Sequence, residues 1–209
     1  MLENIDDISQ RIERIKHKII ECNIHLNASS SQCEIENFEA QYNICLPESY
    51  RRFLLEIGNG GSGPPYYGLV SLADTVSKQR GLEMPPDTRM RFRPDLAFPL
   101  MDIWDRDEEW EKCEDEQLSL EDESKQAALV EAFDAKEQAI YEQGHLYLGT
   151  EGCGEDWILV ITGNERGYIW NRAESITQPC VPRRDFLSWY EYWLDSGSKI
   201  GLDDWLPLP

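Results

Sequence analysis

The side chains of this sequence that could do chemistry are chiefly carboxylates, and they are concentrated in one stretch. Between Asp102 and Glu123 the chain has twelve acidic residues and two basic ones, Arg106 and Lys112, which gives a net charge of −10 in 22 residues. Carboxylates at this density can pair with Lys and Arg side chains of another protein, or attract cations. We call residues 102–123 the acidic segment.

Two tryptophans, Trp104 and Trp110, lie within the acidic segment. An apolar anchor among like charges is costly unless it is used, and Trp is enriched at the dominant positions of protein interfaces. The alternative is a solvated acidic loop whose tryptophans pack on the body of the protein, and the sequence leaves both interpretations open. On the first interpretation the predicted partner-binding residues are Asp102, Trp104, Asp105, Asp107, Glu108, Glu109, Trp110, Glu111, Glu114, Asp115 and Glu116.

The acidic segment also matches part of a calcium-binding loop. Asp105, Asp107, Glu109 and Glu116 occupy its positions 1, 3, 5 and 12. The sixth position of such a loop requires Gly for a sharp turn, and here it is Trp110. An acidic stretch matches this spacing by chance, so we predict no metal site.

The glycine-rich loop Gly58–Gly63 matches the letters of a dinucleotide-binding motif, GxGxxG. That motif needs a strand before it and a helix N-terminus after it, whereas here a predicted helix precedes it and two prolines follow. The sequence has no GxSxG elbow and no phosphate-loop Lys, and Cys22 and His25 lack a second pair of zinc ligands. We therefore expect no catalytic residues and no cofactor, and an enzyme is the least favoured class.

The composition favours a protein partner. The chain has 209 residues, a net charge of −20 and 41% hydrophobic residues, which is typical of a globular protein. The charge would repel nucleic acid and anionic membranes but attract a basic protein. No apolar run reaches 18 residues, the N-terminus has no signal-peptide pattern, and six cysteines form no CxxC pair. We expect a cytoplasmic protein with reduced thiols.

Periodicity predicts helices at both ends of the chain and a sheet between them. Isoleucines spaced by three and four over 2–20 predict an amphipathic helix, which packs on its own domain or forms a weak dimer. A helix from Pro47 to Ile57 ends at Gly58, and a last helix opens at Pro182. The other predicted helices are 33–43 and 121–142, and the predicted strands are 69–72, 89–93, 145–148, 157–162 and 168–170. Strands in hairpins predict an α+β fold with a mostly antiparallel sheet.

Two blocks of residues, in this order, resemble the SUKH superfamily of Smi/Knr-like proteins. The first block comprises Ile35-x-x-Phe38-Glu39, Ile44-x-Leu46-Pro47-x-x-Tyr50-Arg51-x-Phe53-Leu54, Gly58-Asn59-Gly60-Gly61-Ser62-Gly63-Pro64 and Tyr67-Gly68-Leu69. The second comprises Gly152-Cys153-Gly154-x-x-Trp157-x-Leu159, Gly163-x-x-x-Gly167-x-Ile169-Trp170 and Phe186-Leu187-x-Trp189. The resemblance covers roughly residues 33 to 195 and implies an α+β domain; we predict one domain over 1–209, in which the helix at 1–28 is extra and the stretch 76–143 is an atypical insertion.

The resemblance implies that the motif residues form the scaffold and are not catalytic. Packing positions and turn positions make up this set: Leu46, Pro47, Tyr50, Phe53, Leu54, Gly58, Asn59, Gly60, Gly61, Gly63, Pro64, Trp157, Gly163 and Gly167. Most bacterial members look like immunity proteins that neutralise a polymorphic toxin, often a nuclease, whereas fungal relatives regulate cell-wall synthesis. We expect a non-catalytic inhibitor of a basic toxin that binds through the acidic segment, or alternatively an intracellular scaffold or regulatory module.

Overall fold

The computed structural model describes residues 5–76, 92–198 and 205–206. Within these residues the chain forms six α-helices, one short 3-10 helix and five strands. In chain order they are α1 (Ile5–Glu21), α2 (Gln32–Tyr42), α3 (Glu48–Glu56), η1 (Leu72–Thr75), β1 (Trp104–Asp105), α4 (Arg106–Ser119), α5 (Glu123–Glu142), β2 (His145–Gly152), β3 (Glu155–Val160), β4 (Ile169–Arg172), β5 (Ile176–Pro179) and α6 (Phe186–Asp195).

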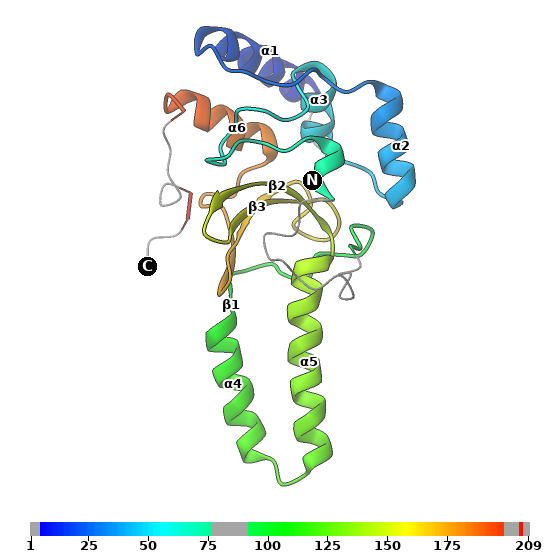
Figure 1. The fold of residues 1–209 in the computed structure, drawn as a ribbon, viewed down its shortest axis with the longest axis vertical. Coiled ribbons are helices and arrows are strands. Elements are labelled where there is room, and N and C mark those ends of the chain that lie inside the picture. Colours follow the sequence, from blue (N-terminus) through cyan, green and yellow to red (C-terminus); the bar gives the residue numbers. More distant parts are fainter. Residues whose placement is uncertain (1–4, 77–91, 199–204, 207–209) are drawn as a thin grey trace.

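The strands form one sheet in the order β1-β5-β4-β3-β2, and every neighbouring pair is antiparallel. Figure 1 shows α1, α3 and α6 gathered on one side of the sheet, while α4 and α5 extend from the other side as a long hairpin. The predicted α+β class is therefore confirmed. The predicted hairpin of strands is also present, since Ile158 on β3 pairs with Trp170 on β4.

The strand β3 separates two apolar cores by its alternation of side chains. Trp157 and Leu159 face the core under the helices, whereas Ile158 and Val160 face a second core on the other side. The helical core also contains the packing residues of the motif, Leu46, Tyr50, Phe53 and Leu54, all of them buried. The second core continues into the base of the α4–α5 hairpin.

The isoleucine seam of the first helix is used inside the domain. Ile8, Ile12 and Ile15 are buried in the core under the helices, and α1 contacts α3 and α6. Burying three isoleucine side chains stabilises the fold by roughly 1.5–3 kcal/mol each. The seam is consequently not free to pair with a second copy of the chain.

The glycine-rich loop closes against the rest of the body. Gly60 has φ +86°, and a Cβ there would lie 2.9 Å from the backbone of Val70 and Ser71. Gly61 exchanges two backbone hydrogen bonds with Leu69, at 2.9 and 2.7 Å. Glycine is needed here because the backbones approach too closely for a side chain.

Two sequence-based expectations require correction, and a third lies largely outside the described residues. Residues 69–72 do not form a strand: Leu69 makes a single bridge, and Leu72 begins η1 because Ser71 caps it. The last helix begins at Phe186, capped by Asp185, and not at Pro182. The strand predicted over 89–93 lies mostly outside the described residues, and its end at Arg93 makes only an isolated bridge.

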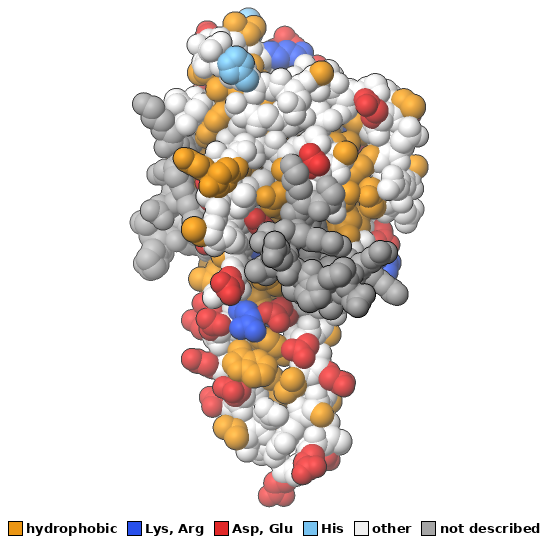
Figure 2. Space-filling view, in the orientation of Figure 1, with side chains coloured by type: hydrophobic (Ala, Val, Ile, Leu, Met, Phe, Trp, Pro, Cys, Tyr) orange, Lys and Arg blue, Asp and Glu red, His pale blue; other side chains and the backbone are white. Residues whose placement is uncertain are grey.

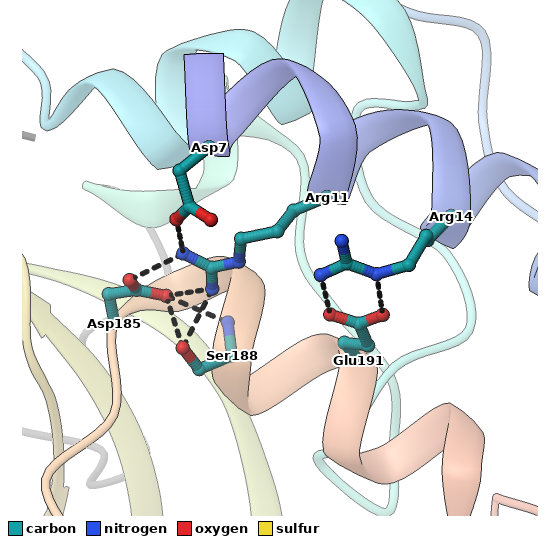
Figure 3. A network of polar contacts seen from close by, with 6 residues as sticks. All are labelled: Asp7, Arg11, Arg14, Asp185, Ser188 and Glu191. Atoms are coloured by element: carbon teal, nitrogen blue, oxygen red, sulfur yellow. Dashed lines mark hydrogen bonds and ion pairs between the residues drawn. The ribbon is translucent and has the colours of Figure 1, made fainter. Parts of the chain in front are cut away.

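A network of charged side chains fastens α1 to the start of α6 (Figure 3). The Arg11 guanidinium donates to both carboxylate oxygens of Asp185, at 2.9 and 2.6 Å, and to Ser188 Oγ at 2.7 Å. Asp185 also accepts from the backbone N–H of Ser188 and so caps α6. Burial alone would raise the pKa of Asp185, but the hydrogen bond and charge of Arg11 outweigh it, and the pKa is lowered.

The substitution Asp185→Asn tests this network, because Asn retains the cap but lacks the charge. A carboxyl whose pKa is lowered by folding stabilises the protein above its unfolded pKa, and this contribution is lost as the pH falls through the lowered folded pKa. We expect Asp185→Asn to reduce the free energy of unfolding by about 1–3 kcal/mol at pH 7, with the difference shrinking below about pH 4. Urea unfolding at several pH values measures this.

The matched control for that measurement is Arg14→Met, because Arg14 pairs with Glu191 between the same two helices but is half exposed. An exposed pair contributes less than about 1 kcal/mol. Equal losses for the two variants would contradict the special role of Asp185.

Candidate protein-binding site

The acidic segment is mostly helical. Asp105 caps α4, since its Oδ1 accepts from the backbone N–H groups of Asp107 at 3.0 Å and Glu108 at 3.1 Å. Three acidic residues in the first turn are favourable because the helix dipole is positive at that end. The segment is therefore a helix and not an irregular loop, but its tryptophans pack on the body as that alternative expected.

The chain reverses after α4 and returns as α5. Asp122 caps α5 by accepting from the N–H of Ser124 at 2.9 Å, and Gln126 Nε2 donates to the carbonyl of Leu120 at 2.8 Å. The two helices lie side by side and project away from the body (Figure 1). We call residues 105–142 the arm.

Aromatic packing holds the arm together and attaches it to the sheet. Phe133 on α5 has its ring centroid 5.1 Å from that of Trp110 and 6.3 Å from that of Trp104. Trp104 is 3% exposed and lies on β1, whereas Trp110 is only partly buried. Trp104 is thus not available as an exposed interface anchor, because its ring is part of the second core.

Ion pairs join the two helices of the arm. Arg106 Nε lies 2.5 Å from Glu137 Oε1, and Glu109 accepts from Lys112 at 2.9 Å and from Lys136 at 3.2 Å. The hydrogen bonds from Lys112 and Lys136 lower the pKa of Glu109. Glu109, one of the predicted binding residues, is therefore engaged within the arm.

The remaining predicted carboxylates are largely on the surface. Asp102, Asp107 and Glu108 are exposed and have one basic neighbour each, at 3.5–4.0 Å. The other four, Glu111, Glu114, Asp115 and Glu116, are exposed and have no ion-pair partner among the described residues. Residues 102–143 contain sixteen acidic and four basic residues, so more than half of the chain's net charge lies here.

The SMI1 / KNR4 family (SUKH-1) model matches residues 30–193. The chain belongs to this family. Comparison with curated proteins and with solved structures finds no significant match. The resemblance seen in the sequence is confirmed, and the matched residues run from just before α2 to α6, with the arm inside them.

The four residues with calcium-loop spacing do not form a loop in this SUKH domain. Asp105 caps α4, and Asp107, Glu109 and Glu116 are spread along its turns. Within residues 5–76, 92–198 and 205–206, no group of three or more His, Cys, Asp and Glu could hold a metal ion. No helix of these residues is long and apolar enough to cross a membrane.

His145 is the histidine whose environment most limits its chemistry. It is fully buried on β2, its Nδ1 lies 2.7 Å from the carbonyl oxygen of Gln143, and its Nε2 lies 3.1 Å from Arg172 Nη1. Burial, and then the charge of Arg172, lower the pKa of His145 to about 3. Its ring is therefore neutral and enclosed, and it belongs to the scaffold of the sheet.

Sequence reasoning located the carboxylates but missed the residues that position them. The pairs Arg106–Glu137 and Glu109–Lys136 join residues 27 to 31 positions apart. One feature of the sequence could have indicated the pairing of Lys136. The spacing of Leu129, Phe133, Lys136 and Ile140 places Lys136 near the apolar side of α5, where a neighbouring helix packs.

The substitution Phe133→Ala should loosen the arm and leave the helical layer intact. Removing a buried aromatic ring costs about 3–5 kcal/mol locally, and Phe133 contacts no residue of the helical core. We expect backbone amides of α4 and α5 to exchange hydrogen at least tenfold faster, with those of α1 and α6 unchanged. Hydrogen exchange measured by mass spectrometry checks this.

The control for that experiment is Leu118→Ala, since Leu118 is 83% exposed. It should leave exchange in the arm unaltered. Faster exchange throughout the domain in Phe133→Ala would show that arm and body unfold as one unit.

Proposed function

We propose that this SUKH domain is a non-catalytic immunity protein that binds a basic protein toxin stoichiometrically and neutralises it. Family membership supports this proposal, since the family includes immunity proteins. The observation that carries it is the arm, a projecting helical hairpin with six exposed carboxylates on α4 alone. The same protein would act without a cofactor, a metal or a bound nucleic acid.

Electrostatics explains why such an arm suits a basic target. A nuclease toxin needs a cationic groove for phosphates, and carboxylates can occupy that groove in their place. Opposite charge also steers the two proteins together and raises the rate of association. α4 is about 21 Å long, which exceeds the Debye length of roughly 8 Å at physiological salt, so each of its carboxylates interacts mainly with the partner charges nearest to it.

The internal bonds of the arm support binding by a preformed surface. Phe133 and Trp104 fix the arm to the sheet, and Glu109 with Lys136 fixes α4 to α5. A surface that is ordered before binding loses less conformational entropy in the complex. The arm therefore combines high charge with a fixed geometry.

The direct test of this function is co-expression with the product of the adjacent gene, where the proposed toxin would be encoded. We expect restored growth and a complex that survives gel filtration. Killing that continues at equal expression would contradict the proposal. A stable complex with a host protein that is not toxic would favour the alternative, a scaffold or regulatory module.

The double substitution Glu111→Lys and Glu114→Lys tests the arm as the binding surface. Both residues are exposed and lack ion-pair partners in the described structure, so the fold should be retained. We expect affinity for the toxin to fall about 100-fold at low salt and less at high salt, because salt screens the interaction. Isothermal titration calorimetry at two salt concentrations measures this.

The matched control carries the same change in net charge on the body, Glu21→Lys with Glu36→Lys. Both residues are exposed, on α1 and α2. Equal weakening by the two double variants would mean that only net charge matters and would place the interface elsewhere.

A further inference from the structure

The two faces of the arm differ in charge, and contacts between the helices define them. Arg106 meets Glu137 on one face, which also carries Trp110, and Glu109 meets Lys136 on the other. We call the first the tryptophan face and the second the lysine face. Residues three, four or seven positions apart on a helix share a face, which assigns the remaining side chains.

The lysine face is neutralised by the protein's own side chains. Lys112 and Lys136 both bind Glu109, and Lys125 lies on the same side of α5, eleven positions before Lys136. Glu116, seven positions after Glu109, adds one exposed carboxylate. A cationic partner gains little from this face because three lysines already occupy it.

The tryptophan face has an apolar centre and acidic edges. Trp110 and Val130 lie along its middle and are partly buried. Asp107 and Glu114 flank Trp110 on α4, three positions before it and four after, and Asp134 lies four positions after Val130 on α5.

Glu123, seven positions before Val130, completes this acidic edge of α5. These four carboxylates are exposed. One face of the arm in Figure 2 has this composition, with hydrophobic side chains along the middle and acidic side chains on both sides.

The one basic residue near this centre is already paired. Arg106 binds Glu137 at 2.5 Å and also lies 3.5 Å from Asp107 Oδ1, so among the four edge carboxylates it meets only Asp107. Two packed helices bury one seam only, and the partly exposed side chains beside it form an apolar strip that a third helix could cover. Leu118, 83% exposed near the tip, extends the apolar surface on the same side, since it lies four positions after Glu114.

We propose that the tryptophan face binds a cationic amphipathic helix of the partner, an inference that rests on the proposed function. Its apolar stripe would cover Trp110 and Val130, and its Lys and Arg would meet the acidic edges. Asp107 and Glu114 are two helical turns apart, about 10 Å, which matches basic residues spaced by seven on a helix. The partner thus supplies a helix with an apolar face. A partner that bound the arm only through a cationic phosphate-binding groove would not need such a helix.

A synthetic Leu/Lys amphipathic peptide of about 14 residues serves as the probe, with a scrambled peptide of identical composition for comparison. Calorimetry should show at least about fivefold tighter binding of the amphipathic peptide, because only it presents apolar groups together. Val130→Ser should remove most of this difference. Ala132→Ser, on the other face of α5, should retain it.

A second pair of variants distinguishes binding at the tryptophan face from a general effect of net charge. Glu114→Lys and Glu116→Lys change net charge equally, on the same exposed helix, but lie on opposite faces. We expect Glu114→Lys to weaken peptide binding about tenfold and Glu116→Lys less than about threefold. Circular dichroism confirms that each variant is folded.

Each result bears on one of the two proposals. Equal binding of both peptides, or equal weakening by Glu114→Lys and Glu116→Lys, would overturn the face assignment and leave toxin neutralisation untouched. Discrimination between the peptides without rescue from the toxin would overturn the immunity function and leave the face assignment standing.

Discussion

The contact of Phe133 with Trp104 and Trp110 is the interaction on which the arm depends. α4 carries six exposed carboxylates, and acidic residues three or four positions apart repel each other by roughly 0.2–0.5 kcal/mol per pair. Such a helix gains little from its own sequence, and Cys113 is the one residue of α4 that is buried. The aromatic rings on α5 and β1, with the ion pairs of Arg106 and Glu109, supply the stabilising contacts that α4 does not form within itself.

The domain therefore consists of two parts, a body built on the helical core and an arm held by the second core. The helical core and the glycine-rich loop contain the residues that carry the family motif, such as Tyr50, Trp157 and Gly60. The arm takes its position from the second core on the opposite side of β3. Its outer side chains make few contacts with the body, so they are available for a partner while the scaffold stays fixed.

The sequence predicted the body and α5 better than α4, for physical reasons. The isoleucines of α1 follow the helix period because one face of that helix is buried, and the run Trp157–Val160 is continuously apolar because both faces of β3 are buried. α4 has no such pattern, and its helix follows from caps and from contacts with residues on α5. β1 and β5 are two and four residues long, too short for any period to appear.

The candidate site shows the same limit. The density of carboxylates marked the candidate surface, but which of them are free depends on partners distant in sequence. Glu109 lies among the predicted residues and is held by Lys136, while Trp104 is held in the second core. The difference between the two faces of the arm likewise follows from the pairing of α4 with α5.

Zero-length carbodiimide cross-linking of the complex with the cognate toxin tests the central claim most directly, because it couples only carboxylates and lysines that are in contact. The account predicts that toxin lysines are coupled to the peptide containing Glu111 and Glu114. Coupling confined to carboxylates of the body, such as Glu21 and Glu36, with the arm unmodified, would contradict it.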